Sequence, residues 1–513
     1  MLFALLLGCA GSSTDLGAVE DTGPAAQVAS GHDTAAGKGG GLSFSVERLE
    51  PYLEAPEPLT ETDVLVIGGG PAGMAAMIEA RAQGAAVLLL ERSSRLGGAA
   101  IYSSGATLFS GTPEQAAEGI TDSPSVLLSD WPTMTGGDPD ATWMLRYAED
   151  NVPEVYTWLT DMGGSFHLSA EQSNGESVPR IHLFNGEGLG MVGLLAGQIP
   201  MDDVMFSVEA QSLVLDAEGL SGVWVTLEGA QAFIAAQSVV VATGGFLRDP
   251  ELVSIANPAL NTDALVSSAA PHATGSGHHM LDVLGADWLR PGAMGLYAHG
   301  VPDPHEAGEE VVLTSLEEAL WVSAAGENFL PEPHTNSYAT AAAVLALPEH
   351  RAFGIFDAGS WPQDGQLFDP IVPPGEAPSL VTIDHLLDAE TAHEAASLAE
   401  LAYAAGIDAS GLLEAADGLA APYLAVQIAP ALAKNFGGIA VDASGQVLAG
   451  GAPLPGVFAA GELTGMAGGS LVGDNPLTGC GFTGSLSAVL LSGRIAGRSA
   501  SEGVPKAAGG DSG

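Results

Sequence analysis

A glycine-rich segment between two apolar runs constrains this chain more than any other feature of its sequence. Asp63-Val-Leu-Val-Ile67 is short and apolar, and Gly68-Gly-Gly70-Pro-Ala-Gly73 follows it at once. Residues 74–83 have the composition of a helix, and the next apolar run, 85–90, ends at Glu91. This order predicts a buried parallel strand, a tight turn, a helix and a second parallel strand.

The glycines of the turn and the acid that ends the second strand predict a dinucleotide site. Gly68 permits the tight turn, Gly70 lets the backbone approach a pyrophosphate, and Gly73 lets the helix pack closely on the strand. The amides and the dipole at the start of the helix favour phosphates. Glu91 lies where a carboxylate accepts hydrogen bonds from ribose hydroxyls, which disfavours the 2′-phosphate of NADP. The sequence therefore predicts NAD or FAD.

Four later segments favour FAD. They are Ala242-Thr-Gly-Gly-Phe246, Lys434-Asn-Phe-Gly-Gly438, Ala460-Gly-Glu462 and Gly473-Asp-Asn-Pro-Leu477. Together with the glycine turn, their order makes the chain resemble the flavoprotein family of soluble fumarate reductases, succinate dehydrogenase flavoprotein subunits, urocanate reductases and 3-ketosteroid dehydrogenases. The resemblance implies FAD as cofactor. It also implies an α/β fold in which a Rossmann-type FAD-binding domain carries an inserted α+β capping domain.

The resemblance and the local composition together predict how the chain is divided. We expect a lipoprotein signal over 1–9, a flexible linker over 10–57, the FAD-binding domain over 60–295 and 423–503, the capping domain over 296–422, and a disordered tail over 504–513.

The apolar start of the chain predicts its location. Leu6-Leu-Gly-Cys9 resembles a lipobox, with Cys9 as the lipidated residue. The segment that follows is rich in Ser, Gly, Ala and Asp, as flexible tethers are. We therefore expect an exported lipoprotein anchored at the periplasmic or cell-surface side of a membrane. No other stretch is long and apolar enough to cross a bilayer.

The resemblance also implies contacts with FAD. Glu91 would hold the adenosine ribose, Gly97 and Gly98 would run beside the flavin, and Glu462 would contact the ribityl chain. The helix start at 475–480 would face the flavin O2 end, where its dipole stabilises negative charge. The residues expected to bind FAD are Gly68, Gly70, Pro71, Ala72, Gly73, Glu91, Arg92, Gly97, Gly98, Ala99, Ser104, Gly105, Ala242, Thr243, Gly244, Gly461, Glu462, Asn475, Pro476 and Leu477.

The substrate region departs from the family. The position of the family's proton-donating arginine is Asn336 here, and an amide donates no proton at neutral pH. A second expected arginine falls within 470–472, where no residue is cationic. Burying a dianion without cations costs several kcal/mol per charge, and the net charge of −48 repels anions. We therefore expect that fumarate is not the substrate.

Lys434, Tyr338 and His299 are the catalytic candidates. Lys434 is one of only three lysines, and it falls where the family keeps a substrate-binding or catalytic group. It either polarises a substrate carbonyl or is a solvated loop lysine. The ketosteroid dehydrogenases use tyrosines for proton transfer, which suggests Tyr338, Tyr297 or Tyr423. His299 corresponds to a family histidine early in the cap.

Other rare polar residues receive structural interpretations. His182 is read mainly as structural, and Arg248 as either an ion-pair residue or a neighbour of the flavin. The adjacent His278 and His279 point opposite ways on a helix, so we predict no metal site.

These observations predict an FAD-dependent oxidoreductase that reduces or desaturates a carbonyl-activated C–C bond of a neutral, apolar substrate by hydride transfer at flavin N5. One alternative is a non-catalytic or electron-carrier flavoprotein at the cell surface. The other is a reductase of a different electron-poor acid that uses Lys434. The sequence has no C-x-x-C-H motif and no second dinucleotide fingerprint, so we expect an external electron donor or acceptor. The acidic composition excludes nucleic acid as a partner.

Overall fold

The computed structural model describes residues 57–502 with the exception of 136–139, 171–174, 218, 261, 331–336, 364–365, 377–378 and 467–484. The predictions for Cys9, Asn336 and 475–477 lie outside the described residues, as does the side chain of Tyr338. In the part of the chain that is described, no helix has the length and apolarity that a membrane span requires.

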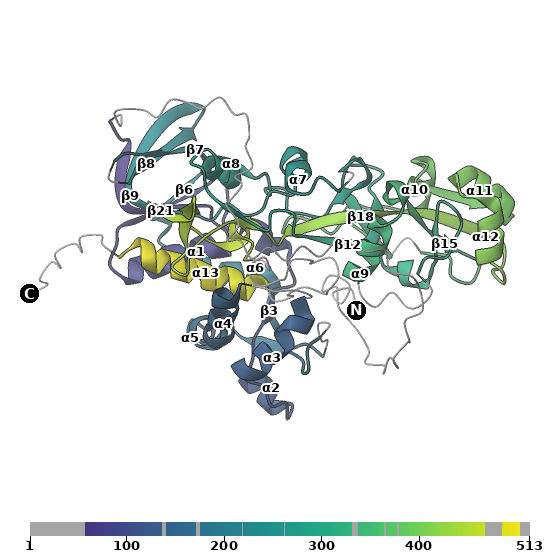
Figure 1. Cartoon of the computed structure of the whole chain (residues 1–513), viewed down its shortest axis with the longest axis horizontal. Helices are drawn as coiled ribbons and strands as arrows, with labels where there is room; N and C mark the ends of the chain where they lie inside the picture. Colours follow the sequence, from purple (N-terminus) through teal and green to yellow (C-terminus); the bar gives the residue numbers. More distant parts are fainter. Residues whose placement is uncertain are drawn as a thin grey trace, which may run out of the picture.

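A sheet built on parallel strands forms one half of the molecule (Figure 1). β1 (Thr60–Ile67) pairs in parallel with β2 (Val87–Glu91) on one side and with β9 (Ala230–Val241) on the other. The remaining strands of this sheet are β6 (Val204–Phe206), β7 (Val208–Leu215), β8 (Leu220–Leu227), β20 (Gln446–Ala449) and β21 (Ala452–Ala459). The Rossmann-type order of strand, turn, helix and strand predicted from residues 63–91 is confirmed.

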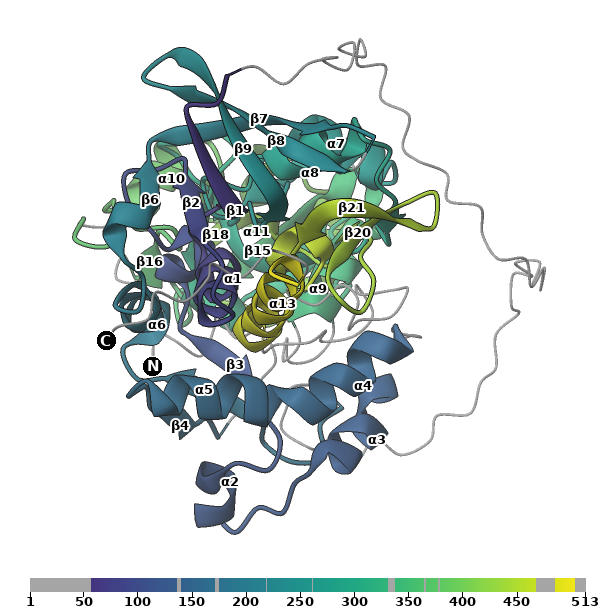
Figure 2. The same cartoon turned by 90° about the vertical axis from the view of Figure 1, so that its left-hand side faces the viewer.

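Two helices from opposite ends of the chain lie side by side against this sheet (Figure 2). They are α1 (Pro71–Ala82) and α13 (Ser485–Ala500). A Cβ on Gly493 would lie 2.3 Å from the Ala72 carbonyl oxygen, so glycine is needed for this approach. The buried carboxylate of Glu79 on α1 accepts a hydrogen bond from Arg494 at 2.8 Å. The pairing of the two helices fixes the start of α1 against the sheet.

A smaller region packs on the far side of α13. It contains α2 (Pro113–Ala117), α3 (Pro124–Thr135), α4 (Ala141–Asp150), α5 (Thr157–Asp161), α6 (Glu187–Ala196) and a sheet of β3 (Ala106–Leu108), β5 (Ile181–Phe184) and β4 (Phe166–Leu168). Its fully buried Arg180 lies 2.7 Å from both Asp122 and Asp130. His182 donates from Nδ1 to the Arg180 carbonyl at 2.7 Å and accepts at Nε2 from Thr112 at 2.7 Å. Burial lowers the pKa of His182. These contacts support a structural role for this histidine.

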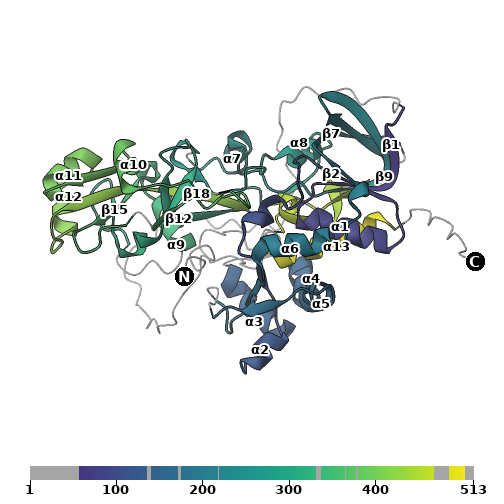
Figure 3. The same cartoon turned by 180° about the vertical axis from the view of Figure 1, so that it is seen from behind.

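A second, mainly antiparallel sheet extends away from the first (Figure 3). Its long strand β18 (Tyr423–Asn435) pairs with β12 (Met294–Pro302) and β15 (Ala352–Phe356). The shorter members are β10 (Val266–Ser267), β13 (Glu310–Leu313), β14 (Leu320–Ser323), β16 (Leu367–Phe368) and β17 (Ala392–Ala395). Helices α9 (Ser337–Leu345), α10 (Ile383–Asp388), α11 (Leu398–Ala405) and α12 (Ala409–Ala415) accompany them. Between the two sheets lie α7 (Pro250–Ala256) and α8 (Ser276–Asp282).

The second sheet takes in more of the chain than 296–422. β12 begins at Met294 and so crosses the predicted limit at 296, and β18 begins at Tyr423 and so lies wholly beyond the predicted limit at 422. The domain boundaries stay a prediction. Ala392–Ala395 forms a strand that pairs with β18, although its Ala-rich surroundings favour helix. Pairing along a buried partner strand outweighs the weak intrinsic helix propensity there.

Candidate functional site

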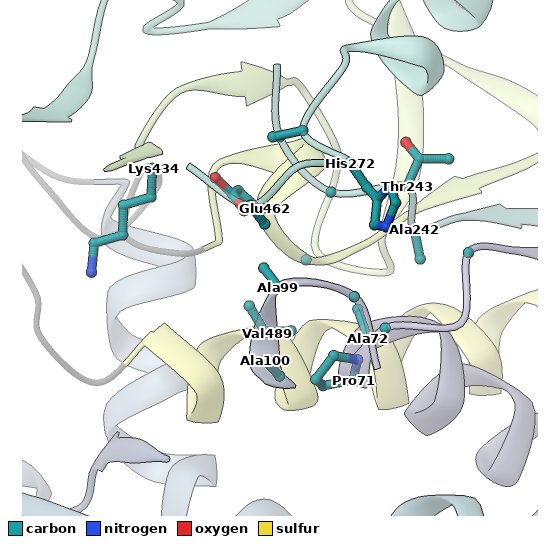
Figure 4. A pocket seen from close by; sticks show the side chains of 18 of the residues that line it. Pro71, Ala72, Ala99, Ala100, Ala242, Thr243, His272, Lys434, Glu462 and Val489 are labelled. Carbon is teal, nitrogen blue, oxygen red and sulfur yellow. The ribbon is translucent and has the colours of Figure 1, made fainter. Parts of the chain in front are cut away.

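A long cavity opens where parallel strands of the first sheet end (Figure 4). Gly68 follows β1, Ala242 follows β9 and Ala460 follows β21, and all three line the cavity. Ligands of open α/β sheets bind at this edge, outside the carboxyl ends of the strands. Lys434 lies at one end of the view, while His272 and Thr243 lie at the other. The cavity therefore links the glycine turn to the second sheet.

The glycine turn has the geometry that phosphate binding requires. Gly68 has φ +106°, and a Cβ on Gly73 would lie only 1.8 Å from the Gly68 carbonyl oxygen. A Cβ on Gly70 would have no neighbour closer than Gly98 Cα at 4.0 Å, so the backbone faces open space. No side chain caps the start of α1, and its first turn has no acid. Its first amides are therefore available to an anion.

Glu91 is held in place and retains acceptor capacity. Its Oε2 accepts from the Gly69 amide at 2.7 Å, and its Oε1 accepts from the Ser93 amide and hydroxyl, both at 2.7 Å. A carboxylate offers about four lone-pair sites, so ribose hydroxyls can still donate to it. Glu91 lines the cavity, which supports the predicted ribose contact.

Glu462 occupies the middle of the cavity wall, on the turn after β21. Its Oε1 accepts from the Asn435 amide at 3.1 Å. A Cβ on Gly245 would lie 2.6 Å from the same oxygen, so that glycine makes room for the carboxylate. Burial raises the pKa of Glu462 to about 7, against the lowering effects of the Asn435 amide and the Lys434 charge. A ligand that donates hydrogen bonds to this carboxyl would favour its ionised form and so lower the pKa of Glu462.

The end of the cavity near the second sheet brings together two of the catalytic candidates. Lys434 and His299 both line it, together with Tyr297. The Lys434 ammonium lies 5.6 Å from the centre of the Phe436 ring. The Tyr297 and His299 rings stack, with centres 5.0 Å apart. Tyr423 is not part of this group, since it begins β18 and its hydroxyl donates to the Leu419 carbonyl.

Most of the predicted cofactor residues within the described part of the chain line the cavity. They are Gly68, Gly70, Pro71, Ala72, Glu91, Arg92, Gly98, Ala99, Ser104, Ala242, Thr243, Gly244, Gly461 and Glu462. Gly73, Gly97 and Gly105 are not among the lining residues. Gly73 instead packs helix on strand, as predicted, and Gly97 and Gly105 serve turns with φ of +133° and +76°. Arg248 pairs with Glu309, which favours its ion-pair interpretation.

Several residues that line the cavity were not predicted from the sequence. Glu209 on β7 lies 3.7 Å from Arg92, and His272 offers its carbonyl to the same guanidinium. Ser268 and Thr243 line the cavity with buried hydroxyls that have no hydrogen-bond partner among the described residues. Such hydroxyls fit a polar ligand, since an unpaired buried hydroxyl is costly. No local motif marks these positions, because they reach the cavity only through the packing of separate strands and loops.

The fold and this cavity define a dinucleotide-binding protein with a Rossmann-type domain. The family model described as "FAD binding domain" matches residues 63–481. The chain belongs to this family, and its cofactor is FAD. Glu91, the uncapped start of α1 and the unpartnered hydroxyls all fit such a group. The predictions of the flavoprotein family, of the fold class and of FAD are confirmed.

Comparison with characterised proteins gives the following relatives. The chain is 28% identical over 459 residues to the NADH:fumarate oxidoreductase of Klebsiella pneumoniae. The aligned segment covers 83% of this chain and 47% of that protein. It is 28% identical over 489 residues to a fumarate reductase (cytochrome) of Shewanella frigidimarina, covering 87% and 78%. It is 26% identical over 551 residues to a KsdD-like steroid dehydrogenase of Mycobacterium tuberculosis, covering 86% and 96%.

Solved structures support the fold. An open conformation of a flavocytochrome c3 fumarate reductase superposes with a TM-score of 0.66 at 24% identity, over 86% of this chain and 78% of that one. A 3-ketosteroid Δ1-dehydrogenase of Sterolibacterium denitrificans gives 0.69 at 17% identity, over 86% and 99%. The chain spans about half the length of the Klebsiella relative. The comparisons place the chain among FAD-dependent oxidoreductases, and they include relatives with both charged and neutral substrates in their names.

Proposed function

We propose that this flavoprotein reduces or desaturates a carbonyl-activated C–C bond in a neutral, largely apolar substrate. The observation that carries the proposal is the charge of the cavity wall. Among the described lining residues, only Arg92 and Lys434 are lysine or arginine. Arg92 faces Glu209 and the loop at His272, so Lys434 is left as the one such cation toward the second sheet. A dicarboxylate would need more cations than this.

The remaining wall of this end suits an apolar ligand. Tyr297 and Ala433 contribute from β12 and β18, and Pro370 and Ile371 come from the loop after β16. Surfaces of this kind stabilise a bound apolar group by about 25 cal/mol per Å² buried. The neutral enone of a steroid-like compound combines such a surface with one polar carbonyl. The steroid dehydrogenase among the relatives is consistent with a substrate of this type.

The described residues fall into two groups, one that would bind the cofactor and one that would act on the substrate. Glu91, the start of α1 and Glu462 would hold FAD, which supplies hydride chemistry when bound. Lys434 is able to stabilise negative charge that develops on a carbonyl oxygen. His299 is able to move a proton at the neighbouring carbon.

The test starts with the protein reduced anaerobically, with its visible spectrum followed as acceptors are added. Reoxidation by a steroid-like enone, and not by fumarate, is the expected result. Fast reoxidation by fumarate would contradict the neutral-substrate proposal and favour an acid-reducing enzyme that uses Lys434. Reoxidation by quinone alone would favour an electron carrier.

Lys434→Met tests the part assigned to the lysine. Methionine keeps most of the aliphatic stem over Phe436 but removes the charge. With an enone that turns over, kcat should fall by about 100-fold, as expected for loss of one stabiliser of developing charge. An unchanged kcat, with FAD still bound, would show that Lys434 is a structural residue. Arg351→Met is a matched control, because that arginine also lies over a ring, Phe353, but does not line the cavity.

The electron partner and the location complete the proposal. We propose that electrons reach or leave the flavin through an external donor or acceptor. We also propose that the protein is exported as a lipoprotein modified at Cys9. Mass spectrometry of the protein extracted from membranes would show a diacylglycerol adduct on the N-terminal peptide. An unmodified peptide from soluble protein would overturn the lipoprotein prediction.

A further inference from the structure

A buried carboxylate lies directly behind the histidine at the substrate end of the cavity. His299 Nδ1 and Glu310 Oε1 are 3.1 Å apart. The His299 side chain lines the cavity, whereas Glu310 does not. Both residues are buried, with exposed fractions of 6% and 2%. The orientation falls short of a hydrogen bond, since none of the four side-chain N and O atoms has such a partner among the described residues.

The hairpin of β12 and β13 creates this contact. Pro302 pairs with Glu310 and Gly300 pairs with Val312, so Glu310 begins β13 beside the end of β12. A Cβ on Gly300 would lie 2.3 Å from Glu310 Oε1 and 2.5 Å from its Cγ. Gly300 therefore leaves the space across which Glu310 reaches His299. The sequence neighbour Glu309 turns the other way and pairs with Arg248.

An unpaired carboxylate in such a place is unfavourable. Removing a carboxylate from water costs several kcal/mol unless a cation or hydrogen-bond donors replace the water. For Glu310, the imidazole of His299 is the basic group that the described structure places within 4 Å. A rotation of the ring would complete the hydrogen bond from Nδ1–H. Nε2 is itself buried and has no hydrogen-bond partner among the described residues, so it stays available to a ligand in the cavity that His299 lines.

We infer that Glu310 is the positioning residue for His299, holding Nδ1 protonated so that Nε2 serves as the proton-transfer atom toward a neutral carbonyl substrate. This inference rests on the proposed function for its catalytic meaning. In the reducing direction the Nε2–H bond breaks and a C–H bond forms at the carbon next to the carbonyl, with the electron pair of the C=C bond. The neutral imidazole regains its proton from water. FAD, when bound and reduced by the external electron donor, would supply the hydride.

The same pair restricts the substrate. A protonated His299 beside an ionised Glu310 has no net charge, so a substrate carboxylate gains little from approaching it. A carbonyl oxygen or a neutral carbon acid needs only one hydrogen bond or one proton. In the described part of the chain, the ionisable neighbours that line the cavity at this point are Tyr297 on the same strand and Lys434 on β18.

The experiment uses the full-length holoprotein labelled with ¹⁵N-histidine, whose His299 signals are identified by their loss in His299→Asn. Imidazole ¹⁵N shifts report which ring nitrogen carries a proton, with no substrate present. In the unmodified protein Nδ1 should stay protonated across neutral pH. In Glu310→Gln the signals should show less Nδ1–H and more Nε2–H, because a neutral amide accepts a hydrogen bond from Nδ1 more weakly than a carboxylate does. Glu309→Gln is the matched control and should leave these signals unchanged.

A second variant protects the test against misfolding. Gly300→Ala keeps the carboxylate but fills the space it occupies, so its His299 signals should move in the same direction as in Glu310→Gln. Identical His299 ¹⁵N shifts in the unmodified protein and in both variants would overturn the inference. This result is independent of whether any enone turns over, so it is distinguishable from failure of the proposed function.

If an enone is reduced, turnover adds a kinetic readout. Glu310→Gln should lower kcat by about 100-fold, with KM within a few-fold, and should alter the pH profile. Glu310→Asp, which keeps the charge, should recover part of the loss. Equal kcat values and equal pH profiles in Glu310→Gln and the unmodified enzyme would also overturn it.

Discussion

Replacing Glu462 by glutamine should remove a pH-dependent penalty from the protein freed of FAD. Burial raises the pKa of this carboxyl to about 7 from an ordinary value of 4.5. The Asn435 amide at 3.1 Å and the charge of Lys434 offset only part of that cost. Glutamine has nearly the same shape and carries no charge, so it can accept the same amide hydrogen bond without the penalty.

The sign and the size follow from the two pKa values. Between pH 4.5 and about 7 the folded state binds more protons at Glu462 than the unfolded state does. The free energy of unfolding therefore falls as pH rises through this window and stays low above it. At about 1.4 kcal/mol per pKa unit the full difference is up to about 3.5 kcal/mol. The carboxyl also faces the cavity, so part of it stays hydrated and the measured value should lie below this limit.

Urea unfolding of the FAD-free protein at about pH 5 and about pH 8.5 measures the effect. Relative to the unmodified protein, Glu462→Gln should gain more stability at the higher pH, by about 2 kcal/mol. Glu414→Gln is the control, because Glu414 is exposed on α12. An equal change at both pH values would refute the reasoning. The same Glu462→Gln substitution should weaken FAD binding, because ribityl hydroxyls donate more strongly to a carboxylate than to an amide.

Three further substitutions test cofactor binding and folding. Gly70→Ala places a Cβ in open space, so FAD affinity measured by flavin fluorescence should fall at least about tenfold while the free energy of unfolding changes by less than about 1 kcal/mol. Gly73→Ala forces a Cβ to 1.8 Å from the Gly68 carbonyl, and urea unfolding should show a loss of about 3 kcal/mol or more. Arg180→Met strands the buried Asp122 and should cost about 3–5 kcal/mol in the same assay. A cost below about 1 kcal/mol at Arg180 would contradict the importance of that ion pair.

The nucleotide half of the site was predictable because its determinants are local. The apolar run at 63–67, the glycines at 68–73 and the acid at Glu91 each act through their own backbone or through the next element. Their spacing is fixed by the lengths of one strand and one helix. For this reason the glycine turn, α1 and β2 all lie where the sequence predicts them.

The second sheet was much less predictable because its determinants are not local. Ala392–Ala395 has a composition that favours helix, but it becomes a strand because β18 offers a free edge. β18 itself joins residues 266–267, 294–302, 352–356 and 392–395 in one sheet. Sequence patterns give no register for pairings over such separations. The predicted boundary near 422 consequently falls at the start of a strand rather than in a linker.

The scarcity of basic residues makes each of their positions informative. Arg180, Arg248 and Arg494 are held in ion pairs with acids, as expected in a chain with 14 basic and 62 acidic residues. Lys434 differs, because its ammonium lies over an aromatic ring and its side chain lines the cavity. His299 differs in another way, because the buried carboxylate of Glu310 lies 3.1 Å from its Nδ1. Among the described residues, this end of the cavity offers one lysine and a histidine backed by a glutamate, which favours a ligand that brings a carbonyl dipole rather than a charge.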